Sequence, residues 1–232
     1  MKSSKIYTSK VYRFLDYALR IVMLNLLIII PSFSFFIIIS NVIGDQSHPL
    51  VYLSLIPTLL WLLPSVVASC DVIKQYEIDK TNTVFKDFFK SLKKVYFTSL
   101  LLTVVTVVVG FVLFNSVKFF YNYANIGVIY LLGLALAVSF LVIFFTIFVH
   151  AILVLAYFKL RIVETIKLAC IMAFKDIVIN IAIIILAALV LSLSMAVYVI
   201  MVTCGFALVC YIMIKLSLKD YIRLYRKYIE KK

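Results

Sequence analysis

The feature that most limits how this chain can fold is a set of five stretches without any Asp, Glu, Lys or Arg. They cover residues 21–44, 46–70, 95–117, 119–158 and 177–214. A helix needs about 20 apolar residues to cross the roughly 30 Å hydrocarbon core of a bilayer. The chain is also 66% hydrophobic and 14% charged, whereas soluble domains are about 45–50% apolar and about 25% charged. We therefore predict an integral membrane protein and exclude a soluble or disordered chain.

The basic residues predict how many times the chain crosses the membrane. The last charge-free stretch would make either one helix of about 57 Å or two spans with a turn near residues 192–198. With six spans, 22 of the 23 basic residues lie on one side and only Lys118 on the other, whereas five spans give 15 and 8. Since basic residues accumulate in cytoplasmic loops, six spans with both termini cytoplasmic are favoured.

The predicted fold is therefore an all-α polytopic membrane helix bundle that forms one domain over residues 1–232. Its spans are expected at residues 17–43, 50–71, 95–116, 128–157, 177–194 and 197–216. The outer connections, near 44–49 and 115–127, are short. The first span is expected to stay in the protein as a signal anchor, because its apolar run is too long for a cleaved signal peptide.

A segment after the second span has the pattern of an amphipathic helix, residues 83–95. Apolar residues recur at helical spacing, charged residues take the other face, and Asn82 or Thr83 can cap its start. Such a helix either lies on the inner leaflet, the interpretation we favour, or forms a docking surface for a partner. The candidate partner-binding residues, which include two prolines of the first two spans, are Phe85, Phe88, Phe89, Leu92, Lys86, Lys90, Pro31 and Pro64.

A weaker second copy of this layout follows 82 residues later, at residues 164–176. The shift aligns Thr83 with Thr165, Phe88 with Cys170 and Leu92 with Phe174. If the repeat is real, spans 2–3 and 4–5 are related by pseudo-symmetry of the kind that transporter folds use. A basic C-terminal helix is expected at residues 217–232.

Few polar residues fall inside the spans. Asn25, His150 and Asn180 are the candidates, and such groups most often form hydrogen bonds between helices, worth about 1 kcal/mol. Asp16 and Arg20 stand four apart at the inner entry of the first span and are expected to form an interfacial pair rather than a proton relay. Asp71 lies at the inner end of the second span, with Lys74 nearby. The four cysteines, which lack metal or redox spacing, are expected to act as small buried hydrophobes.

The prolines of the first two spans bear on helix shape. Pro31, Pro57 and Pro64 each remove a backbone hydrogen bond and are expected to kink the helix. Kinked helices would offer an irregular packing surface or a groove.

The motifs that would indicate an enzyme are missing from the sequence, including GxSxG, HExxH, the Walker A motif and paired carboxylates in a span. We therefore expect no catalysis, no cofactor and no metal. The net charge of +13 is explained by contact with the anionic lipid of the inner leaflet rather than by nucleic acid.

Four motifs stand out within residues 10–97: Arg13-Phe-Leu-Asp16, Asn25-Leu-Leu followed by Pro31, Pro64-Ser-x-x-Ala68, and Lys86-Asp-Phe-Phe-Lys-Ser-Leu-Lys-Lys94. Through these motifs the segment resembles the YesL-like family of small bacterial integral membrane proteins. The resemblance implies a multi-pass protein of the bacterial plasma membrane. It also implies an association with carbohydrate ABC importers, beside whose components such proteins are commonly encoded.

The leading hypothesis is thus a non-enzymatic accessory subunit that packs against the permease subunits of a carbohydrate ABC importer. One alternative is a stand-alone small-molecule transporter, which requires a midplane cavity lined by Asn25, His150 and Asn180. Another is a membrane protein of immunity or stress resistance, which a deletion phenotype would reveal.

Overall fold

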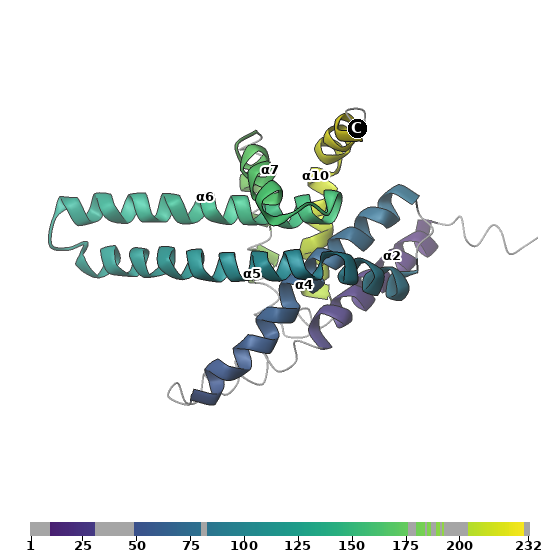
Figure 1. Ribbon diagram of the computed structural model, residues 1–232, viewed down its shortest axis with the longest axis horizontal. Coiled ribbons are helices and arrows are strands. Elements are labelled where there is room, and N and C mark those ends of the chain that lie inside the picture. The colour runs from purple at the N-terminus through teal and green to yellow at the C-terminus, as the bar shows by residue number, and fades with distance from the viewer. Residues whose placement is uncertain are drawn as a thin grey trace, which may run out of the picture.

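The computed structural model describes residues 10–30, 49–79, 83–175, 180–183, 185–186, 189–190, 192 and 204–229. Its elements are α2 (Lys10–Ile29), α4 (Pro49–Asp79), α5 (Val84–Tyr123), α6 (Val128–Phe158), α7 (Ile162–Lys175) and α10 (Phe206–Ile229). These described residues contain helices and no strand (Figure 1), which confirms the all-α class.

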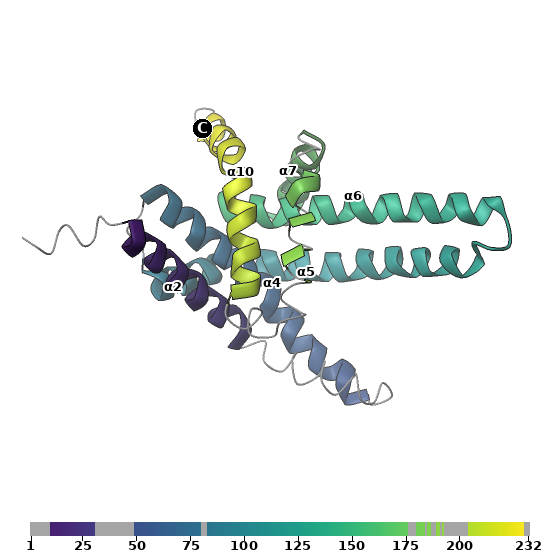
Figure 2. The ribbon, with the colours of Figure 1, turned by 180° about the vertical axis from the view of Figure 1, so that it is seen from behind.

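The helices α5 and α6 are each long and apolar enough to cross a membrane. They contain the predicted spans 95–116 and 128–157, and they run side by side as an antiparallel hairpin (Figures 1 and 2). The buried residues of α5 lie between Phe88 and Thr103, and those of α6 are Ala137 and the run from His150 to Tyr157. Residues 104–146 thus form an arm that projects from the packed part of the protein.

The connection at the tip of this arm is shorter than predicted. Helix α5 continues through residues 115–123, so only residues 124–127 join it to α6. The polar side chains there do not break the helix, because they bond to its own backbone: Asn115 Nδ2 donates to the carbonyl oxygen of Phe111 at 2.8 Å, and Ser116 Oγ donates to that of Val112 at 2.9 Å.

Two glycines lie where the two helices of the arm face each other. A Cβ at Gly133 would lie closer than 3 Å to the Phe120 ring, whereas a Cβ at Gly110 would meet the Phe144 ring at an ordinary 3.6 Å. Gly133 therefore permits a close contact between the two helices, whereas the contact at Gly110 does not require a glycine.

We expect Gly133→Ala to destabilise the arm by about 1–3 kcal/mol, because the Phe120 ring must move. Gly110→Ala is the matched control, and it should be neutral or stabilising, since alanine is the better helix former by about 1 kcal/mol. Thermal unfolding of the purified protein in detergent measures both. Phe120→Ala should remove the penalty of Gly133→Ala, and equal effects of the two alanine substitutions would contradict this packing.

The packed end of the molecule joins α2, α4, the first half of α5, the end of α6, α7 and α10. Its core contains Leu24, Val67, Phe88, Leu153 and Ile214, all at most 1% exposed. Helix α10 runs across the direction of the α5–α6 hairpin, and α4 runs obliquely to this hairpin (Figures 1 and 2). The described helices are therefore not a parallel bundle. The count of six spans and the side of the termini stay predictions.

The amphipathic segment 83–95 is not a separate helix. It is the beginning of α5 and continues without a break into the third predicted span. No proline or glycine interrupts residues 84–109, and the buried face continues through Val95, Ser99 and Leu102. The segment therefore runs straight into its span, as expected, but as part of one helix and not as a distinct interfacial helix; its place on the inner leaflet stays a prediction. Thr83 is the N-cap residue but makes no side-chain cap; Asp87 Oδ2 instead accepts from the Thr83 backbone N–H at 2.8 Å.

The second amphipathic segment is the separate helix α7, which follows a turn at Lys159. The 82-residue repeat pairs Leu92, which is buried, with Phe174, which is 61% exposed. Its burial pattern therefore differs from that of the first segment. The C-terminal segment continues the last predicted span within one helix, α10, and residues 197–203 of that span lie outside the described residues.

The helix α4 contains both Pro57 and Pro64 and is helical from end to end. Pro64 is buried in the packed end, whereas Pro31 lies outside the described residues. Pro64 thus packs inside this chain and does not face a groove open to a partner.

Candidate functional site

The strongest concentration of polar contacts surrounds a buried carboxylate toward the C-terminal end of α4. Asp71 is 0% exposed. Lys74, one turn further along α4, pairs with its Oδ1 at 2.6 Å, as the spacing predicts. Lys159 pairs with Oδ2 at 2.8 Å, and Ser91 Oγ of α5 donates to the same oxygen at 2.6 Å. Asp71 therefore ties α4 to α5 and to the turn after α6. We call these four residues the Asp71 cluster.

The turn after α6 is shaped so that Lys159 can reach this carboxylate. Lys159 is in the left-handed conformation, with φ 53° and ψ 43°, and its backbone N–H donates to the carbonyl oxygen of Leu155 at 3.1 Å. This is the usual way to end a helix, although glycine is the residue that adopts it most easily. Lys74 Nζ also donates to the carbonyl oxygen of Ala156 at 2.7 Å, where a positive charge complements the helix dipole.

A second cluster is centred on His150 of α6, which is 4% exposed. Its Nε2 lies 2.6 Å from Asn180 Oδ1, and its Nδ1 lies 2.8 Å from the hydroxyl of Tyr221 in α10. Asn180 Nδ2 donates to the carbonyl oxygens of Ala173 and Met172, at 2.7 and 3.4 Å. We call His150, Asn180 and Tyr221 the His150 cluster.

These contacts determine the tautomer of the imidazole. Because Asn180 Nδ2 donates to backbone carbonyls, its Oδ1 faces His150 and can only accept. The proton of the neutral ring is therefore on Nε2, and Nδ1 accepts from Tyr221. Every polar atom of the His150 cluster has a partner, and the cluster joins α6, α10 and the end of α7.

Aromatic rings connect the two clusters. Tyr157 stacks on Tyr221 with ring centroids 4.8 Å apart, and Lys74 Nζ lies 5.3 Å from the centroid of the Tyr157 ring. The contacts thus run without interruption from Ser91 through Asp71 and Tyr157 to Asn180. The polar groups of the Asp71 cluster and the His150 cluster therefore form one seam through the packed end.

A third set of contacts holds α2 against α4. Arg20 pairs with Asp16 at 2.9 Å, which confirms that these two residues pair, and its guanidinium lies 4.1 Å from the centroid of the Tyr76 ring. Tyr76 donates to Asp16 at 2.8 Å. Burial alone would raise the pKa of Asp16, but the hydrogen bonds from Arg20 and Tyr76 outweigh it and hold that pKa below its ordinary value.

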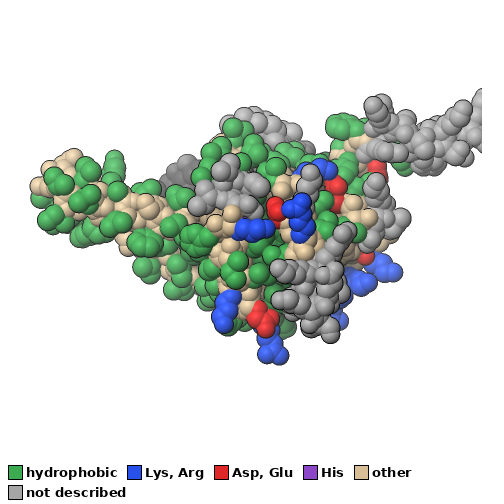
Figure 3. All heavy atoms as spheres, turned by 90° about the horizontal axis from the view of Figure 1, so that it is seen from above, with side chains coloured by type: hydrophobic (Ala, Val, Ile, Leu, Met, Phe, Trp, Pro, Cys, Tyr) green, Lys and Arg blue, Asp and Glu red, His purple; other side chains and the backbone are tan. Residues whose placement is uncertain are grey.

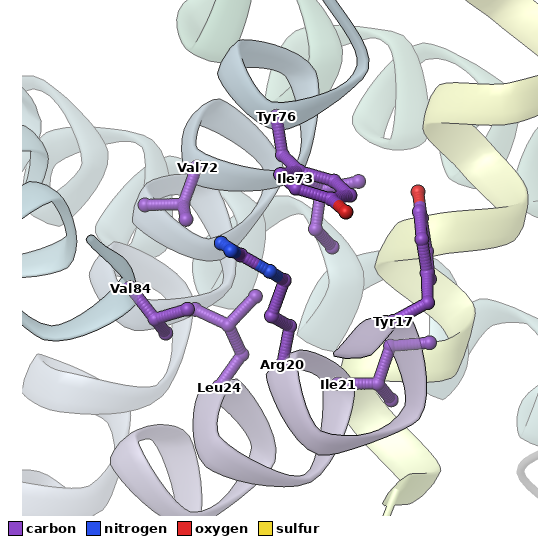
Figure 4. A pocket seen from close by; sticks show the side chains of 8 residues that line it. All are labelled: Tyr17, Arg20, Ile21, Leu24, Val72, Ile73, Tyr76 and Val84. Atoms are coloured by element: carbon purple, nitrogen blue, oxygen red, sulfur yellow. The ribbon is translucent and has the colours of Figure 1, made fainter. Parts of the chain in front are cut away.

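Beside this set, Tyr17 donates to Glu77, whose other carboxylate oxygen lies 3.4 Å from Lys215 Nζ of α10. Figure 4 shows a recess between α2, α4 and the start of α5, into which Arg20 points beside Tyr76 and Val84. It has room for about one water molecule.

Asn25 lies apart from the other two predicted intramembrane polar residues. It is fully buried, and its Oδ1 accepts from the backbone N–H of Ala207 at 3.1 Å. The first N–H groups of a helix lack partners within the helix, so Asn25 of α2 caps the start of α10. The structure thus brings His150 and Asn180 together and gives Asn25 a different role.

The predicted partner-binding residues of α5 divide between two faces. Phe88 and Leu92 are buried in this chain, so they do not contact a partner as we expected. Phe85 and Phe89 are 67% and 42% exposed, and Lys86 and Lys90 are also exposed. The accessible part of the predicted surface is therefore the outer face of α5.

None of the four cysteines forms a disulfide. Cys70 and Cys210 are buried, as predicted, whereas Cys170 and Cys204 are partly exposed. Within the described ranges, no three His, Cys, Asp or Glu side chains gather as a possible metal site.

Chemically, the seam can cross-link helices but offers little room for a ligand. Beside the His150 cluster a second recess, which Ser217 and Asp220 also line, again has space for about one water molecule. The sequence reasoning missed Tyr221, Tyr157, Ser91 and Lys159 as members of the seam. The one sequence signal for any of them is that Tyr221 shares an apolar stripe at helical spacing with Leu218, Ile222 and Tyr225, which is typical of a buried helix face.

Comparison with known proteins gives one match. Residues 21–117 match a family model described as "Protein of unknown function, DUF624". The matched segment runs from α2 through α4 and most of α5, and so includes Asn25, Asp71 and Ser91. No curated protein and no solved structure matches the chain.

Proposed function

We propose that this protein is a non-enzymatic membrane subunit that acts by packing against another membrane protein, and that this partner is the permease of a carbohydrate ABC importer. The observation that carries the proposal is the contrast between the two parts of the molecule. The packed end uses its buried polar groups to join its own helices, while the arm formed by residues 104–146 leaves large apolar side chains uncovered on both helices.

The space-filling view illustrates this contrast. In Figure 3 the projecting arm shows hydrophobic side chains, while the charged side chains gather over the rest of the molecule. Lipid covers such a surface without any specificity, and helices associate within lipid by close packing of small residues. Ala135 and Ser139 are small residues of this kind. Both are exposed, and they lie one turn apart on the side of α6 that faces away from Gly133 and Ala137.

The choice of partner rests on the resemblance of residues 10–97 to the YesL-like family. That family implies a place beside carbohydrate ABC importers, and the matched family model covers most of the same segment. An accessory role suits a chain whose interior offers recesses of water size in its described part.

Co-purification tests this proposal. The tagged protein, extracted from its native membrane in mild detergent, should carry permease subunits with it. Ala135→Leu together with Ser139→Leu should reduce their recovery about tenfold, because overpacking a helix interface costs about 1–3 kcal/mol. The matched control is Leu136→Phe, which adds bulk at a neighbouring exposed position. Recovery of the protein without any permease would refute the proposal.

The rival function, transport by the chain alone, is favoured by one observation: His150 and Asn180 line the same recess. It predicts uptake or efflux of a small molecule by the purified protein in liposomes, and loss of that activity in Asn180→Leu. Transport by the purified protein that Asn180→Leu abolishes would show that the chain acts as a transporter and not as an accessory subunit.

A further inference from the structure

The beginning of α5 presents an exposed aromatic pair that the proposed function does not use. Phe85 and Phe89 lie one turn apart with ring centroids 5.0 Å apart. Their exposed fractions are 67% and 42%. On the same exposed half of the helix, to one side of the pair, are four exposed lysines, Lys86, Lys90, Lys93 and Lys94. We call these six residues the Phe85 face.

The helix cannot rotate to bury this pair. The adjoining side of the helix is held in the core by Phe88 and Leu92, and by the hydrogen bond from Ser91 to the buried Asp71. A rotation that covered Phe85 would break this bond and move Phe88, which is 0% exposed, out of its present place in the core. The outward position of the two rings is therefore a consequence of the packing.

The position of the pair along α5 places it beyond the lipid. The charge-free part of α5 begins at Val95, and at about 1.5 Å per residue Phe89 and Phe85 lie about 9 and 15 Å further along the axis. The headgroup layer adds only about 5–7 Å on each side of the hydrocarbon core. The charge-free window, about 34 Å long, leaves little room for tilt. Both rings thus reach water on the lysine-rich side.

Charge decides what can cover this face. The one acidic side chain among residues 84–95 is Asp87, and it accepts from the backbone N–H of Thr83. With four lysines and one aspartate, this segment keeps a net charge of +3. A second copy of the chain would bring the same lysines against them, so self-association through this face is unfavourable. An acidic surface is complementary, and it gains both the ion pairs and the burial of two aromatic rings.

We propose that the Phe85 face is the docking site for a cytosolic protein that presents an acidic surface around an apolar pocket. Phe85 and Phe89 enter the pocket, and the lysines beside them pair with carboxylates at its rim. This contact lies outside the membrane and does not depend on which membrane protein packs against the arm.

The first test measures whether the face is in water or in lipid. Trp61 is the chain's single tryptophan, so Trp61→Phe gives a protein without tryptophan fluorescence. Phe85→Trp is then introduced into this background as the test variant. Phe97→Trp is the matched control, because Phe97 lies within the predicted span and is 80% exposed. In nanodiscs with anionic lipid, acrylamide should quench Trp at position 85 and brominated lipid should quench Trp at position 97. Quenching of position 85 by brominated phosphatidylglycerol would show a membrane contact and overturn the proposal.

The second test identifies the partner in cells. A photoreactive phenylalanine analogue at position 85 of the full-length chain should form an adduct with a cytosolic protein, through a peptide whose net charge is negative. Lys86→Glu with Lys90→Glu should reduce the adduct about tenfold, whereas Lys118→Glu, at the far end of α5, should not. An adduct with a basic or neutral segment, no adduct, or an adduct indifferent to charge reversal would each overturn the proposal. Failure of permease co-purification would leave these results unchanged.

Discussion

Replacing Asp71 by asparagine is expected to destabilise the folded protein by about 3–5 kcal/mol, the usual cost of leaving a buried charge without its partner. The substitution keeps the size of the side chain but leaves Lys74 without a counter-charge in a site where its side chain is only 12% exposed. The apparent unfolding temperature of the purified protein in detergent should fall by roughly 10 °C.

Two further variants isolate the cause. Lys159→Ala removes the other cation, whose side chain is 31% exposed, and should cost much less because solvent already screens that pair. Asp71→Leu combined with Lys74→Leu removes both buried charges and should recover part of the loss, since apolar replacements of buried ion pairs are often tolerated. An Asp71→Asn protein as stable as Lys159→Ala would contradict a buried ion pair.

The second large effect is expected at His150. Replacing it by phenylalanine leaves the hydroxyl of Tyr221 and Oδ1 of Asn180 without partners, and each unsatisfied buried group costs about 1–3 kcal/mol. Tyr221→Phe removes one hydroxyl and should cost about half as much. The change in the free energy of unfolding is measured for both.

The double variant provides the sharper measurement. Because His150 and Tyr221 share one hydrogen bond, the loss in the double variant should be smaller than the sum of the two single losses by about 0.5–3 kcal/mol. Tyr121→Phe, at a tyrosine that is 70% exposed, serves as the control and should change nothing. Strict additivity would show that the imidazole and the phenol are not coupled.

Both experiments address the same structural idea, that the polar groups of the packed end hold its helices together. Such a packed end would be a fixed base from which the arm and the Phe85 face extend. A change in Asp71 or His150 should therefore also weaken partner binding, but only in proportion to the loss of folded protein. Binding lost from fully folded protein would place these residues in a contact surface instead.

The positions of the third and fourth spans could be predicted because the signal is local. A charge inside the hydrocarbon core is costly wherever the helix packs, so the charge-free windows alone mark α5 and α6. The pairs Asp16–Arg20 and Asp71–Lys74 were predictable for the same reason, since residues three or four apart share one face of a helix.

Helix orientation was harder to predict. The amphipathic pattern of residues 83–95 correctly predicts a helix with two faces, but it does not say whether the apolar face meets lipid or protein. The contact with α4 decided this: it buries Phe88 and Leu92, leaves Phe85 and Phe89 outside, and keeps the segment in line with its span. The pattern shows only that the residues of this face are apolar, and both lipid and the protein core are apolar surroundings.

The sequence by itself determined that the described part of the chain is helical, where two of its helices can cross a membrane, and which polar residues fall in the predicted spans. Only the tertiary structure decided what those polar residues do. Tyr221 is 71 residues from His150, and Ala207 is 182 residues from Asn25. Hydrophobicity and helical period are properties of neighbouring residues, whereas a buried hydrogen bond needs a directional contact between distant helices. That contact exists only once the helices have packed.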